Sequence, residues 1–293
     1  MEKELTAKQL RKMFPDDDAC LEHIMRIRYG SSHECSKCGR DAKYYRTKAR
    51  RSYTCEHCGH QVYPTAGTPF HRSRTSLTDW FTVMHMFTTT RNGVAAKEIQ
   101  RTLGVTYKTA WRMGHVIREY MAYIDGDAPL GGPGGRPVEI DKAFIGGKDK
   151  KGKDDKAVVL GMTERNGDVI LRHVASRRSN DITPHMVEHV RVRSRVYTDE
   201  AHAFNELRWS SDYKHEAVNH KKKEWARGPV HTNTIEGIWS GLKRTVSGTH
   251  VWVSKKWLSS YLGEHEFRHN HRSQAHLMMR LMLTCFPPAR RET

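Results

Sequence analysis

The stretch VEIDKAFIGGK, residues 138–148, places an aspartate inside a strand-like pattern. Apolar residues alternate with Glu139, which is the period of a strand with one buried face, and two glycines then predict a turn. Asp141 has two possible roles at this point. It is either a turn-forming residue of a hairpin or a carboxylate held on a rigid strand to bind a metal ion.

The charge of the chain favours a polyanionic partner. The 293 residues include 50 Lys and Arg against 33 Asp and Glu, a formal net charge of +17. Because the basic residues are spread along the chain, a disordered basic arm does not explain the charge. Nucleic acid is the commonest polyanionic partner of a soluble protein, and an anionic membrane surface is the competing partner. No apolar run approaches the ~18 residues of a membrane span, and the charged start differs from a signal peptide. These features predict a soluble, cytoplasmic protein.

Four of the six cysteines form two C-x-x-C pairs: Cys35 and Cys38, Cys55 and Cys58. Two such pairs can supply four thiolates to one tetrahedral zinc ion, and the glycine after each pair allows its turn to close. A redox site is disfavoured because two matched pairs are present, and the spacing indicates a reducing compartment. We predict a structural Zn²⁺ in a zinc ribbon over residues 33–66, preceded by N-terminal helices in residues 1–32.

Residues 75–125 are predicted to be helical and to include a helix-turn-helix. One helix ends at Gly104, and a second helix rich in polar and basic residues follows. A plain pair of packed helices is the alternative, and the positive charge of the chain favours DNA reading by the second helix. The candidate DNA-binding residues there are Tyr107, Lys108, Thr109 and Arg112.

A Gly/Pro-rich linker is predicted over residues 126–137, and the pattern then changes to strands. Strands are expected over residues 138–145, 157–163, 169–174 and 196–198. Helices are expected over residues 182–192, 201–209 and 234–246. This order predicts an α/β domain of the ribonuclease-H type, a mixed sheet flanked by helices, over residues 138–275, with a C-terminal tail over residues 276–293.

A second acid, Asp199, also follows a short apolar strand and precedes a predicted helix. If the first and fourth strands are neighbours, Asp141 and Asp199 project from the same edge of the domain. Two carboxylates suit a hard cation such as Mg²⁺ or Mn²⁺. A pair of such ions activates a water or a 3′-hydroxyl and stabilises the leaving oxygen in phosphoryl transfer.

The segment HTNTIEGIWSGLKR, residues 231–244, offers a third ligand. Asn233 and Glu236 lie three residues apart on one face of a predicted helix, and both side chains can bind a hard cation. Glu236 is preferred and Asn233 is the alternative. Lys243 lies two turns after Glu236 on the same face, where we expect it, with Arg244, to contact phosphate. Each acid alone is more commonly a turn, cap or surface residue, so the inference depends on all three occurring in order in a basic chain.

The ordered set of motifs resembles the transposases of the IS1595 family, with an ISXO2-like catalytic domain. The resemblance spans about residues 10–275 and includes the four-cysteine ribbon, TAGTPFHRSRTSLTDWF, LGVTYKTAWRM, VEIDKAFIGGK, VYTDE, HTNTIEGIWSGLKR and GEHEFRHNHR. It implies a DDE transposase with a ribonuclease-H-like core that cuts at the inverted repeats of an insertion sequence and joins the 3′ ends to target DNA, using Mg²⁺. The implied partner is double-stranded DNA, bound by a dimer or higher oligomer in a prokaryotic nucleoid.

Carried onto this chain, the resemblance implies Asp141 and Asp199 as the first two acids and Lys243 as the trailing lysine. The third position is Glu or Asn in the family, so Glu236 and Asn233 both stay open. One departure concerns Lys142 and the two residues after it, where similar sequences often carry an acid and a tyrosine.

A non-catalytic DNA-binding regulator is the alternative function. A zinc ribbon and a helix-turn-helix would explain the charge and the cysteines, but residues after the linker would have no role. A regulator of this kind predicts a closed apolar pocket instead of acids on an open basic face. A domesticated transposase that binds DNA without cutting it is a variant of this alternative.

Overall fold

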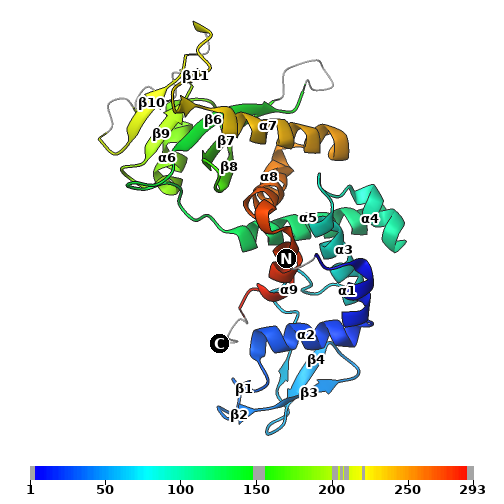
Figure 1. Ribbon diagram of the computed structural model, residues 1–293. Coiled ribbons are helices and arrows are strands. Elements are labelled where there is room, and N and C mark those ends of the chain that lie inside the picture. The colour runs from blue at the N-terminus through cyan, green and yellow to red at the C-terminus, as the bar shows by residue number, and fades with distance from the viewer. Residues whose placement is uncertain are drawn as a thin grey trace. The chain divides into compact units, whose positions relative to one another are not determined.

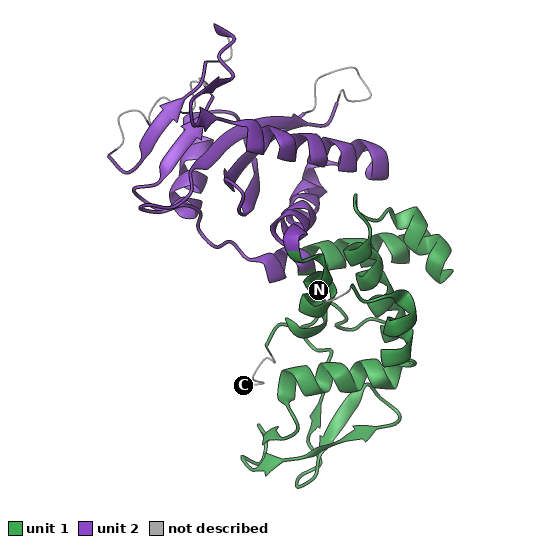
Figure 2. Cartoon of the chain, viewed as in Figure 1, with its two compact units in different colours: residues 1–120, 274–293 green, residues 121–273 purple. Residues whose placement is uncertain are grey.

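The computed structural model describes residues 4–147, 156–199, 204, 207, 211–219 and 222–288. The chain divides into two compact units, as Figure 2 shows. Residues 1–120 and 274–293 form the first unit, and residues 121–273 form the second. Within the described ranges, no helix is both long enough and apolar enough to cross a membrane.

Two short helices open the first unit, α1 (Ala7–Met13) and α2 (Asp17–Tyr29) (Figure 1). Thr6 and Gln9 form a capping box at the start of α1, in which each side chain accepts a hydrogen bond from the other residue's backbone N–H. The Asp16 carboxylate caps α2 in a related way. These local signals explain why both helices were predictable.

The cysteine-containing segment folds into short antiparallel strands. The middle strand β4 pairs with β3 and β5, and β1 pairs with β2. Their bounds are β1 (His33–Glu34), β2 (Asp41–Ala42), β3 (Tyr44–Thr47), β4 (Ser52–Cys55) and β5 (Gln61–Val62). This arrangement fits the predicted zinc ribbon.

Further helices of the first unit follow the ribbon. They are α3 (Leu77–Thr89), α4 (Ala96–Leu103), α5 (Tyr107–Asp125) and α9 (Ala275–Thr284), and residues 121–125 at the end of α5 belong to the second unit. Gly104 ends α4 in the left-handed conformation, with φ of 68°, which lets the chain turn directly toward α5. The predicted helix break at Gly104 is confirmed, whereas DNA reading by α5 stays a prediction.

The C-terminal segment differs from the predicted tail over residues 276–293. Helix α9 packs against α2 and α3, and the Tyr120 hydroxyl donates a hydrogen bond to the Met282 carbonyl at 2.9 Å. The buried side chains of α9 are Met278, Met279, Met282 and Leu283. Because these apolar side chains are buried in the first unit, α9 is part of its core.

The second unit contains a mixed five-stranded sheet in the order β10-β9-β6-β7-β8 (Figure 1). Strand β7 runs antiparallel to β6 and β8, whereas β9 runs parallel to both β6 and β10. The bounds are β6 (Val138–Ile145), β7 (Ala157–Glu164), β8 (Val169–Val174), β9 (Arg195–Thr198) and β10 (Lys214–Ala217). A separate small hairpin comprises β11 (Ala226–Arg227) and β12 (Val230–His231).

Helices cover both faces of this sheet. One core contains apolar residues of α6 (Ser179–His189) together with Val138 and Ile140. The other contains residues of α7 (Asn233–Thr245) and α8 (Lys255–Asn270) together with Ala143 and Ile145. Strand β6 is therefore buried on both faces over its first half. The prediction of a half-buried β6 was wrong for this reason.

The predicted strands and two of the predicted helices are present, with small shifts at their ends. Helix α6 begins at Ser179, three residues before the prediction, and ends at His189. The helix predicted over residues 201–209 lies outside the described residues apart from Phe204 and Leu207, both buried. Strand β10 was missed because its KHEA sequence has no apolar alternation.

The predicted linker over residues 126–137 is instead packed onto the second unit. Leu130 is buried and forms a β-bridge with Val190. Gly131 has φ of 74°, and a Cβ there would lie 2.4 Å from the Ser194 Oγ, so only glycine fits. Gly131 is therefore required for close packing, and the segment is not the flexible linker that its glycine content predicted.

Asp125 provides a test of pH dependence in the second unit. Its side chain is 4% exposed and accepts a hydrogen bond from Asn270, and burial raises its pKa to about 7. When the pKa of a carboxyl is higher in the folded state than in the unfolded state, the protonated group stabilises the folded protein at low pH. This stabilisation is lost as the pH rises from the unfolded-state pKa through the folded-state pKa.

We therefore expect Asp125→Asn, which mimics the protonated form, to gain stability relative to the wild type between about pH 4 and pH 7. The expected gain is about 2–4 kcal/mol in the free energy of unfolding, measured by urea titration at several pH values. Glu216→Gln, at an exposed position of the same unit, is the control. Parallel stability curves for Asp125→Asn and the wild type would refute the assignment.

Candidate active site

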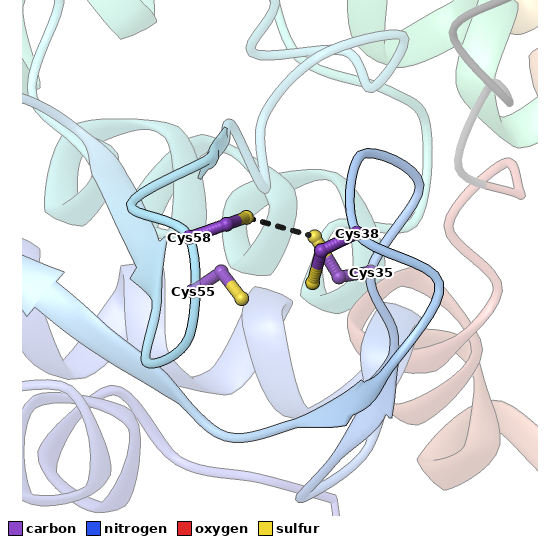
Figure 3. A group of neighbouring side chains, drawn as sticks. All are labelled: Cys35, Cys38, Cys55 and Cys58. Carbon is purple, nitrogen blue, oxygen red and sulfur yellow. Dashed lines mark hydrogen bonds between the residues drawn. The ribbon is translucent and has the colours of Figure 1, made fainter.

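The four predicted cysteines converge in the first unit (Figure 3). All four Sγ atoms lie within 4.8 Å of one another, and those of Cys35 and Cys58 are 3.6 Å apart. Zn–S bonds of about 2.3 Å in a tetrahedron require sulfur atoms about 3.8 Å apart. The cluster therefore has the donor set and the spacing of a structural zinc site.

The turns that carry the cysteines are closed by backbone hydrogen bonds. Gly39 N–H donates to the Cys35 carbonyl at 2.8 Å, and Gly59 N–H donates to the Cys55 carbonyl at 3.1 Å. Both glycines have positive φ, as the glycine after each C-x-x-C pair predicts. Burial raises the pKa of Cys35, but hydrogen bonds, including those from backbone N–H groups, outweigh it and lower the pKa below the usual thiol range. A backbone hydrogen bond at His60 lowers the pKa of Cys58, but burial and hydrogen bonds with the other three cysteines outweigh it and raise that pKa to about 11, so only part of the cluster favours the thiolate.

Replacing Cys55 with Ser should remove most of the bound zinc, from one ion per chain to about a tenth of that, because structural zinc needs all four ligands. Zinc content measured by atomic emission and the far-ultraviolet circular dichroism of the purified chain report the loss. Cys285→Ser, outside the cluster, should keep full zinc. Full zinc content in Cys55→Ser would contradict a four-thiolate site.

Asp141 and Asp199 are brought together by the parallel strands β6 and β9. Ile140 pairs with Thr198, so the next residues along each strand, Asp141 and Asp199, have neighbouring backbones. Burial raises the pKa of Asp141, and the negative charge of Asp199 raises it further. The condition on which the two acids share an edge, that the first and fourth strands are neighbours, is therefore met.

The Asp141 carboxylate is held by helix α7. The Trp239 Nε1–H donates a hydrogen bond to Asp141 Oδ2 at 2.9 Å. Gly161 lies opposite Asp141 on β7, and a Cβ there would lie 2.5 Å from the Trp239 ring. The glycine thus provides the space through which the indole reaches the carboxylate.

Asp199 has a different environment. Its side chain is 28% exposed, and its Oδ1 lies 3.9 Å from the Lys142 Nζ. The Lys142 ammonium also lies 4.6 Å from the centre of the Phe204 ring. The residue at which this chain departs from similar sequences therefore contacts the second predicted acid.

Glu139, two residues before Asp141, is a functional candidate that the sequence reasoning missed. It is fully buried, and its Oε1 accepts hydrogen bonds from Arg165 Nε at 3.0 Å and Nη2 at 2.9 Å. Its Oε2 accepts from the backbone N–H groups of Thr234 at 2.8 Å and Ile235 at 3.1 Å. Glu139 thus satisfies free N–H groups at the start of α7, where a negative charge is also favoured by the helix dipole.

No local sequence signal identifies this cap, because Glu139 and the start of α7 are about 95 residues apart. The residue expected to cap the helix from its own chain, Thr232, makes no side-chain capping bond. An acid inside an otherwise apolar strand was the available sign that Glu139 needed a buried partner.

The two candidates for the third ligand lie at the start of α7. Asn233 is its first residue, and Glu236 lies one turn later; both are exposed. The Thr232 hydroxyl donates a hydrogen bond to Glu236 Oε1 at 3.0 Å. The predicted apolar stripe of this helix is confirmed, since its buried residues are Ile235, Ile238, Trp239 and Leu242.

Among the described residues, the carboxylate oxygens of Asp141, Asp199 and Glu236 do not all lie within 4.8 Å of one another. The four cysteines and the group His185, Glu188 and His189 on α6 meet that criterion. The structure therefore brings the two aspartates side by side and places Glu236 on the exposed face of the adjoining helix.

The predicted DNA-binding residues are largely accessible. On α5, Tyr107, Lys108 and Arg112 are exposed and Thr109 is half-buried. Lys243 and Arg244 are exposed in the last turn of α7. Tyr107 lies beside the Lys97 ammonium, 5.5 Å from the ring centre, and Arg112 stacks over Trp80 at 5.6 Å. Side chains of these types suit contacts with phosphates and bases.

Comparison with known families agrees with this geometry. Residues 129–270 match the ISXO2-like transposase domain, and residues 15–61 match the transposase zinc-ribbon domain. The chain belongs to the IS1595 transposases. The domain match includes both aspartates and the whole of α7, and the ribbon match includes all four cysteines.

A relative from Halobacterium salinarum supports membership of this transposase family. It is named as an uncharacterised protein in the transposable element ISH50. The two chains are 26% identical over 282 residues, which cover 88% of this chain and 92% of the relative. The similarity therefore extends through both units of this IS1595-type chain.

Proposed function

We propose that the protein is a DDE-type transposase that binds the terminal inverted repeats of its insertion sequence, cuts the DNA strands and joins them to target DNA. The observation that carries this proposal is the placement of Asp141 beside Asp199 on the parallel strands β6 and β9, inside the ISXO2-like domain. The strand order of the sheet supports a ribonuclease-H-like core.

Asp141 and Asp199 would hold Mg²⁺ or Mn²⁺, with Glu236 or Asn233 from α7 as the third ligand. A metal pair held there supplies activation of a water or 3′-hydroxyl and stabilisation of the leaving oxygen. Adjacent carboxylates fit this role, because burial and the negative charge of Asp199 both raise the pKa of Asp141, and a divalent cation would offset both effects.

The surrounding residues position this site. The Trp239 indole fixes the orientation of the Asp141 carboxylate, and Glu139 fixes the start of α7, from which the third ligand projects. Lys243 and Arg244 on the same helix are available for DNA phosphates near the reacting strand.

DNA recognition is proposed for the first unit. Helix α5 would read the element ends through Tyr107, Lys108, Thr109 and Arg112, and the zinc ribbon belongs to the same unit. Because two element ends must be joined in one reaction, we propose a dimer or higher oligomer on double-stranded DNA, in the nucleoid of a prokaryotic cytoplasm.

The test uses the full chain loaded with zinc and a labelled duplex that carries the inverted repeat flanking its own gene. With Mg²⁺, we expect a nick at the repeat end and joined products with a second duplex, both resolved on denaturing gels. Specific binding without either product would instead support a DNA-binding regulator or an inactive transposase.

A further inference from the structure

The segment that follows α7 has an unusual backbone. Helix α7 continues into a π-helical turn, η3 (Val246–His250), a rare form that is frequently found at functional sites. Val251 then has φ of 63° and ψ of −48°, and the Trp252 N–H donates to the His250 carbonyl at 2.7 Å. This is a γ-turn with positive φ, which is rare and strained, especially for a β-branched residue.

The strained turn places two apolar side chains in solvent. Val251 is 82% exposed and Trp252 is 62% exposed. Both flanking positions are anchored, because Val246 and Val253 are buried in the core formed with α7 and α8. The turn is therefore fixed at both ends, yet the exposed indole gains none of the stabilisation that burial gives. Strain of this kind, costing about 1–3 kcal/mol, is concentrated at functional sites.

The charge around the turn indicates the chemistry of a partner. No acidic residue occurs in the sequence between Glu236 and Glu264. That stretch instead contains four cations, two before the turn and two after it: Lys243, Arg244, Lys255 and Lys256. The last two begin helix α8, three and four residues after Trp252. An aromatic side chain between pairs of cations is the arrangement with which proteins bind the bases and phosphates of unpaired strands.

We propose that Trp252 is a stacking platform for an unpaired nucleobase of the DNA, with the neighbouring lysines contacting its phosphates. Stacking requires an exposed base face, which a blunt duplex offers only at its terminal pair and a single-stranded extension offers at each base. The proposal rests on the DNA-processing role proposed above, because cleavage at an element end creates such strands. It concerns binding alone and does not require catalysis.

The test compares two labelled duplexes of about 20 base pairs and identical sequence, one blunt and one with a 3′ extension of about four nucleotides. Binding of the full zinc-loaded chain is measured by fluorescence anisotropy without divalent metal. We expect Trp252→Ala to lose about 10-fold affinity for the extended duplex and less than about twofold for the blunt one. Trp252→Phe should retain most of the affinity, since a phenyl ring also stacks. Tyr123→Ala is the control, because Tyr123 is a 53% exposed aromatic side chain of the same unit whose nearest charged residues in the sequence, Asp125 and Glu119, are acidic.

Equal affinities of Trp252→Ala and the wild type for both duplexes would overturn the proposal, as would equal losses on both. The alternative is that a second copy of the chain covers Trp252, and light scattering tests this by measuring the mass of the oligomer. If Trp252→Ala lowers the mass of the oligomer and leaves the preference for extended DNA intact, the surface is an interface between copies of the chain. Unchanged zinc content and thermal unfolding show that the variant folds. The two proposals can fail separately. If the wild type prefers the extended duplex and this preference depends on Trp252, but the protein does not cut the repeat duplex, the stacking role is supported and the proposed catalysis is refuted.

Discussion

Asp141→Asn is expected to lower Mg²⁺-dependent strand cleavage by at least about 1,000-fold. The substitution keeps the size of the side chain and its capacity to accept the Trp239 hydrogen bond, but it removes the charge that would bind metal. Metal ions contribute several kcal/mol of transition-state stabilisation in phosphoryl transfer, and each 1.36 kcal/mol is about tenfold in rate. Single-turnover cleavage of the labelled repeat duplex measures the effect.

The same variant should bind the repeat duplex within about threefold of the wild type, because the proposed recognition residues are elsewhere. Asp168→Asn controls for the loss of one negative charge, since Asp168 is exposed at the turn between β7 and β8. Cleavage by Asp141→Asn at the wild-type rate would show that Asp141 is not a metal ligand.

Glu139→Ala is expected to lower the free energy of unfolding of the second unit by about 3–5 kcal/mol. The substitution leaves the buried side of Arg165 without its carboxylate and two N–H groups at the start of α7 without an acceptor. Breaking a buried ion pair by removing one partner has a cost of about this size. Urea denaturation followed by tryptophan fluorescence measures it, since Trp239 lies on α7.

Glu139→Gln should cost less, about 1–3 kcal/mol, because the amide oxygen still accepts from α7. The matched control is Glu216→Ala. Glu216 is 53% exposed, its carboxylate lies 3.8 Å from Arg227, and its loss should cost under about 1 kcal/mol. Equal destabilisation by Glu139→Ala and Glu216→Ala would show that the buried carboxylate does not anchor the helix.

The parts of this fold that the sequence predicted are those set by local patterns. Spacing of cysteines and glycines predicted the cluster of four thiols, and periodicity predicted β6 to β9 and the buried stripe of α7. Asp141 and Asp199 were expected at one edge on the condition that the first and fourth strands are neighbours, and the pairing of β6 with β9 meets that condition.

The parts that were missed depend on contacts between distant segments. Glu139 was read as the polar position of an alternating strand, and its role became visible only with α7 covering that face. Helix α9 was missed because its place near the end of the sequence suggested a tail, and position in the chain does not show whether a segment is buried. The packing of Leu130 was missed because the glycine content around it suggested a linker, and glycine content does not show burial either. The choice between Asn233 and Glu236 also depends on how the start of α7 meets the sheet, and it stays a prediction.

The most direct test of the proposed active site is the anomalous difference density of Mn²⁺ soaked into crystals of the full chain. We predict a peak bound by the carboxylates of Asp141 and Asp199, with a ligand from either Asn233 or Glu236. Two results would contradict the proposed catalytic site. One is a peak only at His185, Glu188 and His189. The other is density in which Asp199 stays paired with Lys142 and no metal binds Asp141.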